Sequence, residues 1–185
     1  MNKILKTTIV LTIPFLFSSC SKIGSMINNI GYSEVKYDEF HEKAVNAWVD
    51  VPYTLATVNG TIVSTKDNTK TTTELKNVRV EVEDGRPVAK SSASTQEQMA
   101  STYVYQNATT ISDVSNIDSD YMQVSMKYYV YFNGGFKIVE KYKIDYPEIG
   151  LKEEGESTII YDKYGMMTKM AASGTSSGKI SISYK

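Results

Sequence analysis

The clearest pattern in the sequence is a strict alternation of apolar and polar positions in the second half of the chain. Every second position from 122 to 132 is apolar, and the pattern resumes after the turn Asn133-Gly134-Gly135. Alternation with a period of two is typical of a strand with one buried face, and a Gly-containing turn between two such runs predicts an antiparallel hairpin. The apolar positions of the two strands are Met122, Val124, Met126, Tyr128, Val130 and Phe132, then Phe136, Ile138, Tyr142, Ile144 and Tyr146.

Shorter runs of the same kind predict further strands on both sides of this hairpin. Val78, Val80 and Val82 alternate with charged residues before the turn pair Asp84-Gly85. An irregular alternation between Leu55 and Val58 indicates a bulge. The remaining predicted strands are 53–64, 70–76, a short return at 87–90, and a C-terminal meander formed by 159–161, 166–172 and 180–184.

One segment, 38–49, has helical rather than strand-like periodicity. Its apolar side chains recur at spacings of three and four and therefore share one face of a helix. Asp38 is expected to cap the helix, and Pro52 prevents a long continuation. The apolar stripe consists of Tyr37, Phe40, Ala44, Ala47 and Trp48, and we expect it to be buried.

About eight strands that follow one amphipathic helix predict an α+β fold. The helix is expected to cover the concave face of a curved antiparallel sheet, as in an open half-barrel. The segment 89–120 is the least regular part of the chain. Within it, Ser94–Ser101 is compatible with a short helix, Tyr103 and Tyr105 fit another strand, and 107–120 has the composition of a loop.

The first twenty residues have a different pattern. Lys3 and Lys6 precede an apolar run from Ile9 to Phe17, and Ser18-Ser19-Cys20 follows it. The run is too short to remain in a bilayer as a helix, and its basic start is typical of a signal peptide. Cys20 is the only cysteine of the chain. Because secreted proteins rarely keep one unpaired cysteine, its place after the signal needs an explanation.

This leader resembles the lipobox of bacterial lipoprotein precursors, with Phe17 in place of the usual leucine. The resemblance implies that 1–19 is removed as a signal peptide and that Cys20 receives the lipid. The protein would then be anchored to the extracytoplasmic face of the cell membrane. The alternative is an ordinary secretory signal in which Cys20 is incidental. The composition of 20–34 predicts a flexible tether, and 35–185 has the length of a single domain.

The chain offers few residues for catalysis or for metal binding. Its only histidine is His41, and the sequence contains no Gly-x-Ser-x-Gly motif and no paired-histidine or calcium-loop spacing. The formal net charge is −1, and there is no long basic run. The sequence therefore predicts no enzyme, no metal or other cofactor and no binding of nucleic acid.

Two functional hypotheses remain open. The order of helix and strands loosely resembles the lipoprotein-carrier architecture, which implies that an acyl chain or another apolar ligand binds between helix and sheet. A wall rich in methionine suits an irregular ligand, although the same residues also suit an ordinary core. The wall and its lid would comprise Phe40, Trp48, Met122, Val124, Met126, Tyr128, Phe136 and Ile138.

The second hypothesis is a surface interaction or assembly protein with no small-molecule ligand. Tyr129 and Tyr131 alternate with the predicted core positions and should therefore lie on the opposite face of the sheet. Tyrosines that are exposed on a strand face are suited to a contact with another protein.

Overall fold

The computed structural model describes residues 31–66, 69–113 and 117–185. The predicted leader, Cys20 and most of the predicted tether lie outside the described residues.

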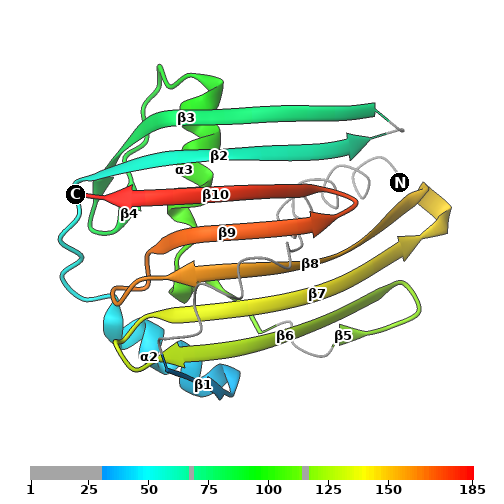
Figure 1. Ribbon diagram of the computed structural model, residues 1–185, viewed down its shortest axis with the longest axis horizontal. Helices are drawn as coiled ribbons and strands as arrows, with labels where there is room; N and C mark the ends of the chain where they lie inside the picture. Colours follow the sequence, from blue (N-terminus) through cyan, green and yellow to red (C-terminus); the bar gives the residue numbers. More distant parts are fainter. Residues whose placement is uncertain (1–30, 67–68, 114–116) are drawn as a thin grey trace, which may run out of the picture.

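The fold is built on one open, ten-stranded antiparallel sheet that does not close into a barrel. The strand order is β1-β6-β7-β8-β9-β10-β2-β3-β4, and β5 pairs with β6 at the β1 side (Figure 1). The α+β class is confirmed, although the sheet has ten strands rather than about eight. The strands are β1 (Tyr32–Val35), β2 (Leu55–Lys66), β3 (Thr69–Glu83), β4 (Arg86–Pro87), β5 (Ile117–Asp118), β6 (Met122–Tyr131), β7 (Phe136–Tyr146), β8 (Leu151–Tyr161), β9 (Met167–Gly174) and β10 (Ser177–Tyr184).

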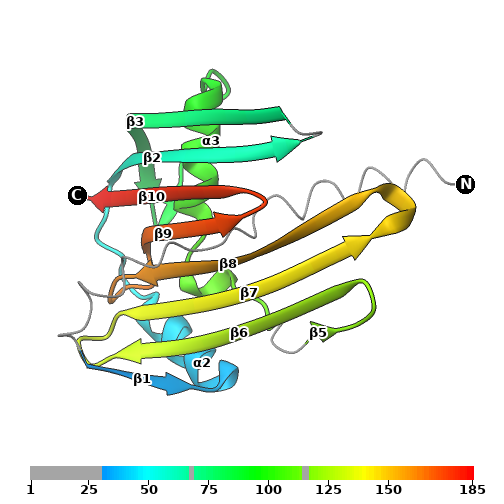
Figure 2. The same cartoon turned by 45° about the vertical axis from the view of Figure 1, so that its right-hand side comes forward.

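Two helices, α2 (Tyr37–Ala47) and α3 (Thr95–Tyr105), lie on the same face of the sheet (Figures 1 and 2). We call this the inner face and the opposite one the outer face. The short 3-10 turns η1 (Ala108–Thr110) and η2 (Pro147–Ile149) complete the secondary structure of the described residues. No helix in the described part of the chain is long and apolar enough to cross a membrane.

Helix α2 confirms the predicted apolar stripe, but its two ends differ from the predicted 38–49 helix. Phe40 and Ala44 are fully buried. The N-cap is Lys36 with no side-chain cap bond, so the expected capping by Asp38 is wrong. Trp48 follows the helix as its C-cap residue and is only half-buried, because the chain leaves the helix at that point.

Helix α3 begins at a capping box that the sequence encodes. The Ser94 hydroxyl accepts a hydrogen bond from the Glu97 amide, and the Glu97 carboxylate accepts one from the Ser94 amide. This arrangement satisfies two amides that would otherwise lack a partner at the helix start. The helix then continues to Tyr105, so Tyr103 and Tyr105 belong to it rather than to the alternative strand.

The β2–β3 hairpin joins two segments that the sequence predicts as separate strands. β3 runs through both 70–76 and 78–82 and is interrupted by a bulge opposite Asn59, where the register shifts between Val58 and Gly60. Asn77 has φ +51° there, and its amide donates to Asn59 Oδ1 at 2.8 Å. The bulge therefore lies just after the 55–58 irregularity, and its left-handed residue is an asparagine, which tolerates that conformation.

The first strand corrects the predicted start of the domain. Tyr32–Glu34, which the sequence places in the flexible tether, pairs with β6 from Tyr129 to Tyr131. Phe132 is a second correction. It continues the alternation of β6 but is 83% exposed, because it already belongs to the turn that leads to β7.

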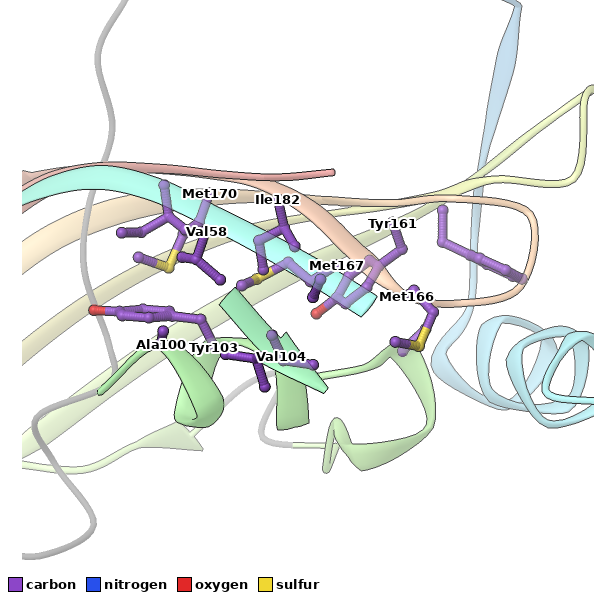
Figure 3. Packing of buried hydrophobic residues seen from close by; sticks show 14 of the residues in the cluster. Val58, Ala100, Tyr103, Val104, Tyr161, Met166, Met167, Met170 and Ile182 are labelled. Atoms are coloured by element: carbon purple, nitrogen blue, oxygen red, sulfur yellow. The ribbon is translucent and has the colours of Figure 1, made fainter. Parts of the chain in front are cut away.

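The main core lies between the inner face and the two helices. Figure 3 shows Ala100, Tyr103 and Val104 of α3 facing side chains of the sheet above them. Their neighbours come from strands that are far apart in the sequence, which ties the C-terminal meander to the β2–β3 hairpin. The labelled sheet residues of this contact are Val58, Tyr161, Met167, Met170 and Ile182.

Candidate functional site

The predicted ligand wall is divided between two packed clusters. Phe40, Tyr128, Phe136 and Ile138 belong to the main core and are each at most 3% exposed. The ring centroids of Phe40 and Tyr128 are 5.2 Å apart, and those of Phe40 and Phe136 are 5.5 Å apart. These distances are typical of packed aromatic pairs. The lid and the wall therefore contact each other directly.

The other predicted residues lie around this cluster rather than across a cavity from it. Val124 belongs to a second, smaller cluster with Tyr142 and Ile144, and Met122 packs against that cluster. Met126 contacts both clusters. Among four hollows of the described residues, Trp48 lines one beside the β3–β4 turn, and Met122 lines another next to Tyr121 and Lys143. No other predicted wall or lid residue lines any of the four. The packing therefore favours a core over a ligand cavity.

A buried carboxyl group separates the two clusters. Glu140 points to the inner face of β7 and is 2% exposed. One of its oxygens accepts a hydrogen bond from the Ser157 hydroxyl at 3.0 Å, whereas Oε1 is buried and has no hydrogen-bond partner within residues 31–66, 69–113 and 117–185. Desolvation by burial raises the pKa of Glu140 to about 7, although the Ser157 bond opposes the shift. The carboxyl is therefore partly protonated near neutral pH.

Two tyrosine hydroxyls share this environment. The Tyr142 and Tyr161 hydroxyls are buried without a hydrogen-bond partner among the described residues. Burial is the main cause that raises the pKa of both tyrosines, and the Glu140 charge adds to it. None of the four hollows is lined by Glu140, Tyr142 or Tyr161. The group is thus a polar strip inside the core, with no opening through these hollows.

Glu140 is not identified as a buried residue by the sequence analysis, although the alternation on β7 indicates it. The alternation on β7 reads Phe136, Ile138, Glu140, Tyr142 and Ile144, so a charged residue occupies a core position. A charge at such a position is uncommon and indicates either a partner or a shifted pKa.

The outer face carries an aromatic cluster at the β1 end of the sheet, which we call the aromatic corner. The Tyr32 ring is 5.2 Å from the Tyr129 ring and 5.6 Å from the Tyr131 ring. Lys137 Nζ lies 3.8 Å from the Tyr32 centroid and 4.1 Å from the Tyr129 centroid. Tyr129 and Tyr131 thus lie opposite the core face, as predicted. Tyr129 is only half-exposed, however, and Tyr131 is 7% exposed, so the expected exposure of Tyr131 is wrong.

A shallow hollow of about 550 Å³ crosses the outer face over β8, β9, β10 and β2. We call it the outer groove. Small residues form much of its lining, and Ala171 is only 5% exposed because longer neighbours surround it. Lys169 and Lys179 are its only charged residues, and neither belongs to an ion pair of the described residues. The groove lining therefore carries two positive charges and no negative one.

The strand register connects the two features. Lys137 of the aromatic corner lies opposite Ile160, and Ile160 lies opposite Lys169 of the outer groove. Ile160 itself lines the groove. The aromatic corner and the outer groove therefore form one continuous strip that combines tyrosine rings, lysines and small polar residues.

Comparisons with protein-family models, with curated proteins and with solved structures gave no match. In the described part of the chain, no cluster of three or more histidine, cysteine, aspartate or glutamate side chains is arranged to hold a metal ion. The leader and the geometry of the two sheet faces are therefore the features that indicate a function.

Proposed function

We propose that the protein is a bacterial lipoprotein, anchored through Cys20 to the extracytoplasmic face of the cell membrane, that binds a partner protein with its outer sheet face. The leader sequence supports the anchor. The observation that supports the binding function is the contrast between the filled inner wall and the open outer groove, whose two lysines form no ion pair in the described part of the chain. The apolar-ligand carrier stays a prediction that the packing does not favour.

The composition of the strip suits a protein contact. Tyrosines supply large, rigid contact areas, and tyrosine is enriched among the residues that dominate binding energy. Lys137 is already held between Tyr32 and Tyr129, so little side-chain freedom is lost when a partner covers it. The aromatic corner would therefore provide the anchor point of the contact.

The charge of the groove indicates the chemistry of the partner. Lys169 and Lys179 have no acidic neighbour among the lining residues, so an acidic side chain from outside would complement them. The small floor residues allow an extended segment to lie flat on the strands. We therefore propose an acidic, extended protein segment as the partner.

The anchor is tested with the full chain and the variant Cys20→Ala. If Cys20 carries the lipid, the variant should leave the membrane fraction or remain unprocessed, whereas Ser21→Ala should behave as the unaltered chain does. Unchanged detergent partitioning of Cys20→Ala would contradict the anchor.

The binding function is tested by placing a photo-crosslinking residue at position 160 in intact cells, with position 43 on the exposed side of α2 as the matched control. We expect a discrete adduct from position 160 only. Lys169→Glu combined with Lys179→Glu should remove most of this adduct, and the corresponding arginine pair should retain it. Equal adducts from position 43, or no effect of charge reversal, would contradict the proposal.

A further inference from the structure

The sheet has one long backbone edge that no described strand pairs with. One side of β3 pairs with β2 along its length. On the opposite side of β3, only Val82 and Glu83 are paired, and their partner is β4. The amide of Val88 donates to the Glu81 carbonyl and extends this cover by one residue of β3. The stretch Thr69–Leu75 therefore forms a free edge, which we call the β3 edge.

The outward backbone groups of the β3 edge can be identified. The Gln96 side-chain amide of α3 donates to the Glu74 carbonyl at 3.2 Å, so the backbone of Glu74 points away from β2. In an antiparallel strand the outward groups recur at every second residue. Thr72 and Lys70 therefore also present their amide and carbonyl groups outward. The side chains of Lys70, Thr72 and Glu74 are all exposed.

The charges along the β3 edge are self-complementary. If a second copy of the edge approaches in antiparallel orientation with the two-fold axis at Thr72, Lys70 of each copy lies opposite Glu74 of the other. Opposite charges at directly facing positions stabilise an antiparallel pair, as do facing threonines. Lys70 belongs to no ion pair of the described residues, so its charge is available for this contact. Glu74 pairs with Lys76 of its own strand at 2.6 Å, and because both side chains are exposed, Glu74 can exchange this partner for Lys70 of the other copy.

We propose that the β3 edge pairs with the same edge of a second copy of this chain, in the register that places Thr72 opposite Thr72. The contact forms a two-fold dimer in which the two sheets continue into each other. The bulge at Asn77 ends the pairing on one side, because it breaks the flat edge. This proposal rests on β3 alone and is independent of the lipid anchor and of the outer groove.

The chemistry of the edge also indicates the strength of the dimer. Lys70 and Glu74 are exposed, so their pairing selects the register more than it adds affinity. The Gln96 contact does not block the edge, because a carbonyl oxygen can accept a second hydrogen bond. Natural sheets usually protect long edges, so an exposed edge with matched charges favours a specific partner over random association. We expect a dimer that dissociates on dilution.

The register is tested by disulfide trapping of the full chain, purified in detergent, with the variant Thr72→Cys. Facing residues of a hydrogen-bonded antiparallel pair have Cα atoms about 5.5 Å apart, which suits a disulfide. We expect a trapped dimer on mild oxidation. Thr71→Cys is the matched control, since the register places Thr71 opposite Thr73 of the other copy. The unaltered chain reports any dimer formed through Cys20.

Charge reversal then tests the complementarity in the Thr72→Cys background. Lys70→Glu brings like charges together twice across the two-fold axis, so the trapped fraction should fall roughly fivefold or more. Adding Glu74→Lys should restore most of it. The proposal is overturned if Thr71→Cys is trapped as readily as Thr72→Cys, or if charge reversal leaves the trapped fraction unchanged.

Discussion

The two faces of the sheet share the same strands but are chemically different. On β7, Phe136 and Ile138 point inward and are at most 2% exposed, whereas the intervening Lys137 and Val139 are half-exposed on the outer face. One face is therefore a packed core and the other an open surface with a groove. Alternation along a strand therefore locates the core but does not reveal which face binds a ligand.

The polar groups of the two faces also differ in what they do. On the inner face, a carboxyl oxygen of Glu140 and the hydroxyls of Tyr142 and Tyr161 are buried without hydrogen-bond partners among the described residues, and the outer face has one such group, the Tyr131 hydroxyl. On the outer face, Lys169 and Lys179 are exposed to water. Buried polar groups without partners destabilise the fold, whereas solvated lysines are available for binding at little expense of stability.

The largest difference between the faces should come from removing an inner aromatic ring. Phe136→Ala deletes a ring that packs against Phe40, and we expect a loss of about 3–5 kcal/mol in the free energy of unfolding. Val139→Ala, on the outer side of the same strand, should cost about 1 kcal/mol or less. Urea denaturation of both variants measures the difference. Similar losses would mean that the outer face is also packed.

Glu140→Gln should change the pH dependence of stability, because it removes the titrating carboxyl of the inner face. Burial raises the pKa of Glu140 from 4.5 to about 7, so between these values the folded chain holds a proton that the unfolded chain has released. The stability of the unaltered protein therefore falls as pH rises through this interval. At about 1.36 kcal/mol per pKa unit, the difference reaches about 3 kcal/mol above pH 7.

The glutamine variant lacks this titration and should be the more stable protein at pH 8, with little advantage at pH 4.5. Glu156→Gln is the matched control, because Glu156 pairs with Lys141 on the outer face. Its unfolding curve should show little change of this kind. Parallel stability profiles of the Glu140→Gln variant and the unaltered chain would contradict the buried, unpaired carboxyl.

Much of the fold follows from local patterns in the sequence. The β6–β7 hairpin and the α2 stripe were predictable because apolar side chains recur there with one clear period. The strand at Tyr32–Glu34 was not predictable, because it is held by its pairing with β6 and has no alternating pattern of its own. The sequence predicts two strands in place of the single long β3, because the bulge at Asn77 shifts the phase of the alternation.

The candidate site was less accessible to sequence reasoning. The face of Tyr129 and Tyr131 follows from alternation alone, but the outer groove depends on small residues from four strands that meet only in the sheet. Their juxtaposition is set by strand order, which no local pattern encodes. On β7, Glu140 lies between Ile138 of the main core and Tyr142 of the smaller cluster.

A smaller effect should come from the buried hydroxyls. Tyr161→Phe removes a hydroxyl that has no hydrogen-bond partner among the described residues and keeps the ring. We expect a gain of about 1 kcal/mol in unfolding free energy, because the desolvated polar group is lost. Tyr32→Phe, on the half-exposed outer side, should change stability by about 0.5 kcal/mol or less. A loss of stability in Tyr161→Phe would reveal a partner for this hydroxyl.

The smallest expected effect lies within the aromatic corner itself. Lys137→Met keeps an unbranched side chain but removes the charge above the Tyr32 and Tyr129 rings, which should lower the unfolding free energy by roughly 0.5 kcal/mol. Lys141→Met removes an exposed ion pair with Glu156 and should have a still smaller effect. Because the outer face contributes so little to stability, both variants should fold as the unaltered chain does. If the aromatic corner binds a partner, Lys137→Met should nevertheless weaken the adduct from position 160, whereas a large loss of stability would make Lys137 a structural residue instead.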